Sequence, residues 1–337
     1  MSPKKIVRTL SKSFFKARGY GSTTSRIVPA ALLVGVLLSL LWWLTFSAPK
    51  DFIAPSLVRI DEGSTIDQAA QQLKEKKVIR SARLFSLSVQ ILGGNRGLIA
   101  GDYYFPSPEN TIHIARRMAT GNFELDPIKV TIPEGATSYE IADILSERLA
   151  FFDAATFRKL AIEKEGFLFP DTYYFLPTED PETVVRVLED TFYRRIEPLR
   201  DAIERSGHSL SEIVIMASLL EEEARTMETR RMISGILWHR IDIGMLLQVD
   251  AVFPYIIGKN TFTVTRAELQ TDSPYNTYKY KGLPIGPISN PGLGSIEAAV
   301  KPIKSNYIFY LADNSGVTHY SRTYEEHLRK KRLYLGS

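Results

Sequence analysis

Three adjacent carboxylates, Glu221, Glu222 and Glu223, directly follow an apolar segment that begins at Ile213. On a helical wheel Glu222 falls nearly opposite the apolar face, whereas Glu221 and Glu223 lie on its two flanks. A carboxyl group that is half-embedded in an apolar wall is disfavoured as an anion, so it can stay protonated and act as a general acid. The alternative is a helix end with solvated carboxylates. Periodicity does not separate Glu221 from Glu223.

Two further segments must position these carboxylates. Residues 232–241 carry apolar side chains at helical spacing, which predicts a second helix. Residues 271–292 contain a proline or glycine every few positions, which excludes a regular helix or a central strand. The tyrosines of this loop, together with Asn276 and Thr277, suit a carbohydrate, because sugar ring faces pack on aromatics and sugar hydroxyls pair with amides and hydroxyls. A buried strand over 306–312 and a basic helix over 324–335 are expected to follow.

The composition excludes several classes of site and partner. A chain of 337 residues predicts two or three domains. The absence of cysteine excludes disulfides, thiolate metal sites and a cysteine nucleophile. The five histidines are scattered, so we expect neither a metal site nor a cofactor. The first 26 residues hold seven basic side chains and no acid, so the net charge of +4 becomes −3 for the remainder, and nucleic acid is not an expected partner.

Residues 27–46 contain no charged side chain, and about 20 apolar residues are the length of a membrane-spanning helix. The basic tail, residues 1–26, places the N-terminus in the cytoplasm by the distribution of lysine and arginine. We therefore expect a single-pass, uncleaved anchor in the cell membrane, inner or plasma, with the catalytic part periplasmic or otherwise outside the cytoplasm. A cleaved signal peptide is the alternative, but residues 47–49 resemble a cleavage site only weakly.

Beyond a linker at 47–55, alternating strand and helix patterns predict an α+β fold. The first helix should start with a capping box of Ser64 and Asp67. The phrase VRIDEGST at 58–65 recurs as VTIPEGAT at 130–137, which predicts an internal strand–turn–helix repeat. The first copy resembles the start of a LysM module, a domain that binds glycans containing N-acetylglucosamine. The alternative is an ordinary α+β packing unit, which would have the same sequence pattern.

These patterns divide the folded part into three segments. Residues 56–125 form the LysM-like subdomain, and residues 126–206 hold the second copy and a connector whose end, 152–206, should be mostly helical. The aromatic stretch 166–175 is either core or a platform for sugar stacking. Residues 207–337 then form a mixed α+β catalytic domain.

The chain resembles the membrane-anchored endolytic murein transglycosylases, the MltG or YceG-like family. The resemblance rests on Met216-Ala217-Ser218-Leu219-Leu220-Glu221-x-Glu223, Arg240-x-x-x-Gly244-Met245-x-Leu247-Gln248-x-Asp250, Tyr275-Asn276-Thr277-Tyr278, Gly282-Leu283-Pro284, Asn290-Pro291-Gly292 and Phe167-Leu168-Phe169-Pro170-Asp171-Thr172-Tyr173. It covers nearly everything after the anchor, in the same order. Val249, Ala251 and Ile285 depart from the family pattern, which has threonine, proline and proline there.

The resemblance selects Glu221 as the catalytic residue and implies cleavage between N-acetylmuramic acid and N-acetylglucosamine inside nascent peptidoglycan strands. One carboxyl group would protonate the leaving oxygen and then accept the proton of the C6 hydroxyl, which closes a 1,6-anhydro ring. The expected substrate-binding residues are Glu223, Gln248, Asp250, Tyr275, Asn276, Thr277, Tyr278 and Asn290. Penicillin-binding synthases are the implied partners. A hydrolytic muramidase that pairs Glu221 with Asp250, or a non-catalytic wall-binding scaffold, are the alternatives.

Overall fold

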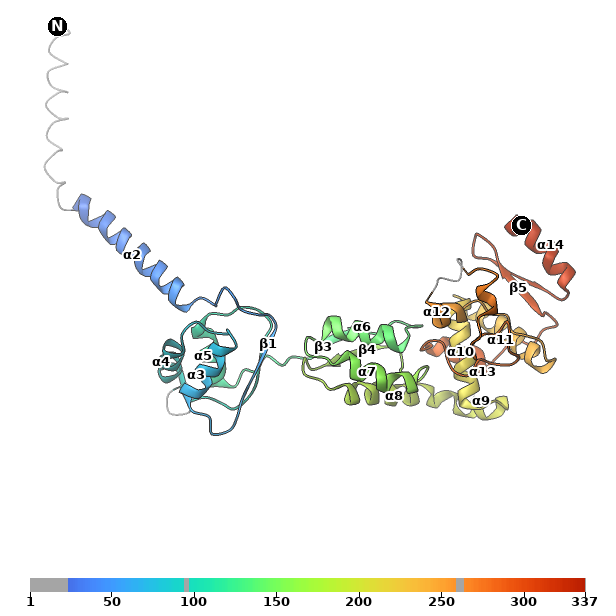
Figure 1. Cartoon of the computed structure of the whole chain (residues 1–337), viewed down its shortest axis with the longest axis horizontal. Helices are drawn as coiled ribbons and strands as arrows, with labels where there is room; N and C mark the ends of the chain where they lie inside the picture. The colour runs from blue at the N-terminus through green and yellow to red at the C-terminus, as the bar shows by residue number, and fades with distance from the viewer. Residues whose placement is uncertain (1–23, 94–96, 259–263, 337) are drawn as a thin grey trace, which may run out of the picture. The chain divides into compact units, whose positions relative to one another are not determined.

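The structure is a computed structural model that describes residues 24–93, 97–258 and 264–336 (Figure 1). The chain forms two compact units, residues 1–125 and 126–337. Each unit combines helices with small sheets of two antiparallel strands. The α+β class predicted from the sequence is therefore confirmed.

Helix α2, Thr24–Phe46, covers the charge-free run that was predicted to be an anchor. Among the described residues, no helix meets the combined requirement of length and hydropathy for crossing a membrane. The predicted anchor thus receives no support from the structure. Residues 1–23 of the predicted basic tail lie outside the described residues, and residues 24–26 belong to the start of α2.

The first unit is built on strands β1, Ser56–Ile60, and β2, Gly101–Phe105, which pair antiparallel with Val58 opposite Tyr103. Helices α3, Ile66–Glu75, α4, Ala82–Gly93, and α5, Thr111–Thr120, complete a core around Val58, Phe85 and Tyr103. The capping box lies one residue later than predicted: Thr65 caps α3, and its N–H donates to the Gln68 side chain at 2.8 Å.

The second unit opens with the second copy of the repeated phrase. Strand β3, Ile128–Thr131, pairs antiparallel with β4, Thr172–Phe175, and helices α6, Ser138–Arg148, and α7, Ala154–Ala161, lie between them in sequence. The first unit has the same strand–helix–helix–strand order, and Thr137 with Glu140 forms the matching capping box.

Residues 152–206 are mostly helical, as predicted, and strand β4 at 172–175 is the exception. Tyr173 and Phe175 of this strand are buried and Tyr174 is exposed, an alternation that a strand with one buried face produces. The buried aromatics of the stretch 166–175 therefore belong to the core. A short 3-10 turn (η3, Ile162–Lys164) precedes β4, and helix α8, Pro181–Ile196, follows it.

The remainder of this unit surrounds helix α10, Leu210–Glu223, which packs against α11, Met227–Asp242, and α13, Leu293–Val300. All residues from Ile213 to Leu220 are buried, so the middle of α10 is enclosed on every side. The sequence predicted one apolar face, whereas this middle part is buried all round. The other elements are η4 (Glu197–Leu199), α9 (Arg200–Ser206), α12 (Val252–Ile257), η6 (Glu268–Gln270) and α14 (Tyr324–Leu335).

The strand predicted over residues 306–312 is shorter and less buried than expected. Strand β5, Phe309–Ala312, pairs antiparallel with β6, Thr318–Ser321, and only Leu311 among the β5 residues is buried. Neither β6 nor α13 was predicted. Both have apolar and polar residues in too short a run to show a period.

Candidate active site

The three carboxylates follow one another in the last turn of helix α10, but their side chains point in different directions. A capping box of Ser209 and Glu212 starts the helix, and Ala224 ends it. Successive residues of a helix are about 100° apart, so the carboxyl groups of Glu221, Glu222 and Glu223 enter three different surroundings.

Glu221 is held by two donors. Its Oε1 accepts from Nη2 of Arg230 at 2.5 Å, and its Oε2 accepts from the N–H of Gly292 at 2.9 Å. Arg230 is fixed in turn, because its Nε donates to the carbonyl of Ala224 at 2.8 Å. The side chain of Glu221 is 6% exposed. A guanidinium and an amide N–H, and not the apolar flank inferred from the wheel, therefore surround the oxygens of this carboxyl group.

A carboxylate that was not predicted as a site residue, Glu134, lies beside this pair. The side chain of Glu134 fills the space next to Gly292: a Cβ atom on Gly292 would lie 1.9 Å from its Oε1. Burial raises the pKa of Glu134, the negative charge of Glu221 raises it further, and Arg230 opposes the shift. The one indication in the sequence was the repeated phrase that contains Glu134.

Backbone hydrogen bonds fix the turn that carries Glu134. The N–H of Gly135 donates to the carbonyl of Asn290 at 2.9 Å, and the N–H of Asn290 donates to the carbonyl of Ala136 at 3.1 Å. The loop before α13 is also tied to α10, because the N–H of Ile288 donates to Oγ of Ser218 at 3.1 Å. Residues distant in sequence are thus fixed around the end of α10.

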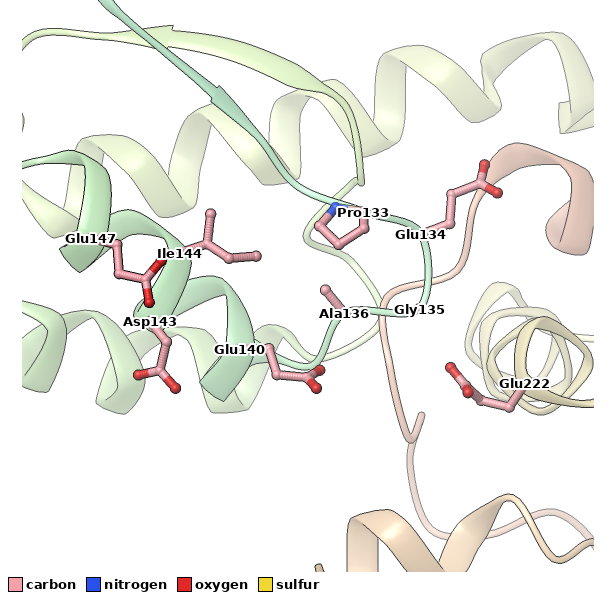
Figure 2. Close-up of a pocket in the computed structure, with 9 residues that line it drawn as sticks. All are labelled: Pro133, Glu134, Gly135, Ala136, Glu140, Asp143, Ile144, Glu147 and Glu222. Atoms are coloured by element: carbon pink, nitrogen blue, oxygen red, sulfur yellow. The ribbon is translucent and has the colours of Figure 1, made fainter. Parts of the chain in front are cut away.

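A groove of about 500 Å³ runs from this turn along α6 (Figure 2). It is lined by Pro133, Glu134, Gly135, Ala136, Glu140, Asp143, Ile144, Glu147 and Glu222. Burial raises the pKa of Glu222, and the charges of Glu221 and Glu140 add to the rise. Despite its five acidic side chains, the described part of the chain contains no cluster of three His, Asp or Glu arranged to hold a metal ion.

Glu223 and Asp250 border two other cavities, of about 690 and 400 Å³. Tyr310 donates to Oε2 of Glu223 at 3.1 Å, and the Tyr278 hydroxyl donates to Asp250. Burial raises the pKa of Glu223 to about 7, and the neighbouring charge of Asp250 adds to this rise. The exposed Gln248 lines the smaller cavity with Tyr278. Four of the predicted substrate-binding residues therefore lie together at cavity walls.

The other four predicted binding residues are buried or partly buried inside the second unit. Nδ2 of Asn276 donates to the carbonyls of Leu269 and Thr271 at 2.9 and 2.8 Å, and its Oδ1 accepts from the N–H of Tyr278 at 3.0 Å. Tyr275 packs against Tyr255, with 4.9 Å between ring centroids. These contacts order the loop that carries Tyr278.

Thr277 and Asn290 are buried, with exposed fractions of 1% and 0%. Oγ1 of Thr277 accepts from the N–H of Val249 at 3.0 Å and donates to its carbonyl at 3.2 Å. Nδ2 of Asn290 donates to Glu165 at 2.7 Å and to the carbonyl of Ala136 at 2.9 Å. Direct contact of these residues with a sugar stays a prediction, because their polar atoms are used inside the protein.

Comparisons with known proteins show which family the chain belongs to and which proteins it is similar to. The profile of the YceG-like family matches residues 58–333. The chain belongs to this family. A solved structure of a YceG-like protein from Listeria monocytogenes is 32% identical, with a TM-score of 0.55, and the match covers 82% of this chain and 99% of that one.

Two relatives of this chain bear the name endolytic murein transglycosylase. The one from Bacillus subtilis is 29% identical over 318 residues, which are 86% of this chain and 87% of the relative. The one from Streptococcus pneumoniae is 26% identical over 322 residues, which are 83% of this chain and 58% of the relative. The family resemblance drawn from the sequence motifs is thus confirmed.

Proposed function

We propose that this chain is an endolytic murein transglycosylase, a lyase that acts on peptidoglycan. The observation that carries the proposal is the match to the YceG-like family over residues 58–333, together with relatives that are named for this activity. The last turn of α10 supports it, because it delivers carboxylates to the walls of three cavities. Glycosidic cleavage needs carboxyl groups in such a position.

The bond to be cut joins N-acetylmuramic acid to N-acetylglucosamine inside a nascent strand. A proton passes to the oxygen of the leaving sugar while the C6 hydroxyl of the muramic residue attacks C1 and loses its own proton. The product is a 1,6-anhydro end, and no water is consumed. Because the nucleophile belongs to the substrate, the protein contributes orientation and proton transfer. Glu221 is the carboxyl group proposed for this proton transfer, and cutting would terminate strand growth.

The hydrolytic alternative needs Glu221 and Asp250 on opposite sides of one bond. Glu221 faces Arg230 and Gly292, whereas Asp250 faces Tyr278 and shares its cavities with Glu223. These different surroundings disfavour a Glu221–Asp250 pair. No contact in the described residues favours the scaffold alternative over the enzyme.

The test is the chemistry of the new strand ends. Purified protein should release fragments from peptidoglycan whose muramic ends are 1,6-anhydro, as measured by mass spectrometry after digestion. Reducing ends would establish a hydrolase instead, and intact strands would leave only wall binding.

Localisation is a proposal that rests on the sequence. The charge-free run 27–46 behind a basic tail supports an anchor with the catalytic unit outside the cytoplasm, beside penicillin-binding synthases that extend the strands. Protease added to intact spheroplasts should degrade the bulk of the chain. A full-length chain that resists the protease, or a soluble product that starts near residue 48, would contradict this placement.

A further inference from the structure

The exposed face of helix α4 differs from the exposed faces of the other two helices in the folded part of the first unit. The exposed side chains of α3 and α5 are all polar or charged. On α4, Leu87 and Ile91 are 52% and 73% exposed, and the half-buried Leu84 precedes them. Positions 84, 87 and 91 fall within about 60° of one another around a helix, so the three side chains form one apolar ridge.

The core of the first unit does not account for this ridge. Phe85 and Val89, on the other side of α4, are buried and belong to that core. The side of a helix that faces water is normally polar. Neighbouring exposed apolar side chains mark a surface that binds a protein or a membrane. The ridge is therefore a candidate contact surface.

The linker that follows α2 is fastened next to the start of α4. Nε of Arg80 donates to the carbonyl of Ala48 at 2.9 Å, and Nζ of Lys77 pairs with Asp51 at 3.0 Å. Helix α4 begins at Ala82, and its twelve residues extend about 18 Å at 1.5 Å per residue. The whole ridge thus lies close to the place where the linker joins the first unit.

We propose that the ridge of Leu84, Leu87 and Ile91 inserts into the headgroup region of the bilayer and holds the first unit on the membrane surface. This inference rests on the proposed anchor at 27–46, which would end at that surface just before Ala48. Helices that lie in the membrane interface bury an apolar face by about 5–10 Å and carry basic side chains on the polar face. Arg83 is exposed beside the ridge, and α4 has no acidic residue that would repel anionic lipids.

A bilayer suits the ridge better than a second copy of the chain does. A stable protein interface buries about 800 Å² on each partner and is centred on aromatic or arginine side chains that fill pockets. The ridge consists of three aliphatic side chains on one helix, and the exposed faces of α3 and α5 are polar. Shallow insertion into lipid needs no larger area and no matching pocket.

The first experiment uses the absence of cysteine from the chain, which allows a nitroxide label at a single introduced cysteine. The full chain is reconstituted into vesicles of phosphatidylethanolamine and phosphatidylglycerol. EPR power saturation then compares label collisions with oxygen, which concentrates in lipid, and with a nickel chelate, which stays in water. Labels at Leu87→Cys and Ile91→Cys should collide more with oxygen. The matched control, Gln71→Cys on the exposed face of α3, should collide more with the chelate.

A label at Leu37→Cys in α2 tests the anchor separately. If the Leu37 label lies in lipid while the Leu87 and Ile91 labels lie in water, the inference is overturned and the anchor stands. If the Leu37 label lies in water, the anchor is rejected, and the inference survives only if the Leu87 and Ile91 labels are still in lipid. Shielding of these two labels from both reagents would show that a second copy covers the ridge, which also overturns the inference. These collisions do not depend on catalysis, so failure of the proposed activity is a distinct result.

The second experiment combines Leu87→Glu with Ile91→Glu and places the label at Gln90→Cys, which is exposed next to the ridge. Two carboxylates disfavour insertion beside anionic lipids, so collisions of this label with the nickel chelate should rise relative to collisions with oxygen. The control adds the same charge to the other exposed faces through Gln71→Glu with Thr120→Glu, and the ratio should stay parental. Because the replaced side chains lie outside the core, thermal unfolding should be unchanged. A parental ratio in the Leu87→Glu, Ile91→Glu variant would contradict the inference.

Discussion

Replacing Glu221 by glutamine should lower the turnover of glycan strands by about 10²–10⁴-fold, the usual contribution of a general acid or base. The amide keeps one oxygen for Arg230 or for the N–H of Gly292 but presents an NH₂ group to the other donor. It can no longer take up a proton. The lost contact should destabilise the fold by about 1–3 kcal/mol. The change is measured as kcat by quantifying anhydro ends, with circular dichroism to verify folding.

Glu222→Gln is the matched control on the same helical turn. The carboxyl group of Glu222 lines the groove and is not held by Arg230 or Gly292. Its kcat should stay near that of the parent. Equal losses in Glu221→Gln and Glu222→Gln would mean that the charge of the helix end matters and that no single residue transfers the proton. Full activity of Glu221→Gln would remove Glu221 from the mechanism.

The sequence predicted the elements around the site better than it predicted their contacts. The boundaries of α14 and the order of elements in the first unit follow from periodicity and from caps, which are local, although α10 begins three residues before the apolar segment that predicted it. The partners of Glu221 are not local. Arg230 lies nine positions away across a helix boundary, and Gly292 lies 71 positions away. No period or spacing encodes such pairs, so a helical wheel assigned Glu221 the wrong surroundings.

The residues of the loop 271–292 show a second reason why contacts were harder to predict than elements. Asn276, Thr277 and Asn290 were predicted to bind sugar because amides and hydroxyls suit sugar hydroxyls. The same groups also satisfy the backbone of an irregular loop, which has no ladder of its own. The structure uses them for that purpose, and a sequence does not show how many buried carbonyls and N–H groups a loop must satisfy. The contact of Glu134 was also missed, because nothing local in the sequence shows that the carboxyl group of this turn packs against Gly292.

Replacing Asn290 by alanine should destabilise the second unit by several kcal/mol. Three buried groups would lose this partner: the carbonyl of Ala136, the N–H of Leu168 at 2.9 Å and the carboxyl group of Glu165 at 2.7 Å. A buried polar group without its partner costs about 1–3 kcal/mol, so a total of about 3–5 kcal/mol is expected. Activity should fall as well, because Asn290 belongs to the loop whose Gly292 donates its N–H to Glu221. Chemical denaturation of the folded protein measures the free energy of unfolding.

The contrasting variant is Asn290→Asp, which keeps the acceptor for Leu168 and places a second carboxyl group beside Glu165. Burial already raises the pKa of Glu165, and a neighbouring carboxylate would raise it further. A carboxyl group whose folded-state pKa is raised contributes stability at low pH that is lost as the pH rises through that pKa. The deficit of Asn290→Asp relative to Asn290→Ala should therefore grow with pH. The exposed Asn306→Ala should change the free energy of unfolding by no more than about 0.5 kcal/mol. If Asn290→Ala were equally harmless, Asn290 would not be what joins the turn at 133–137 to the loop before α13.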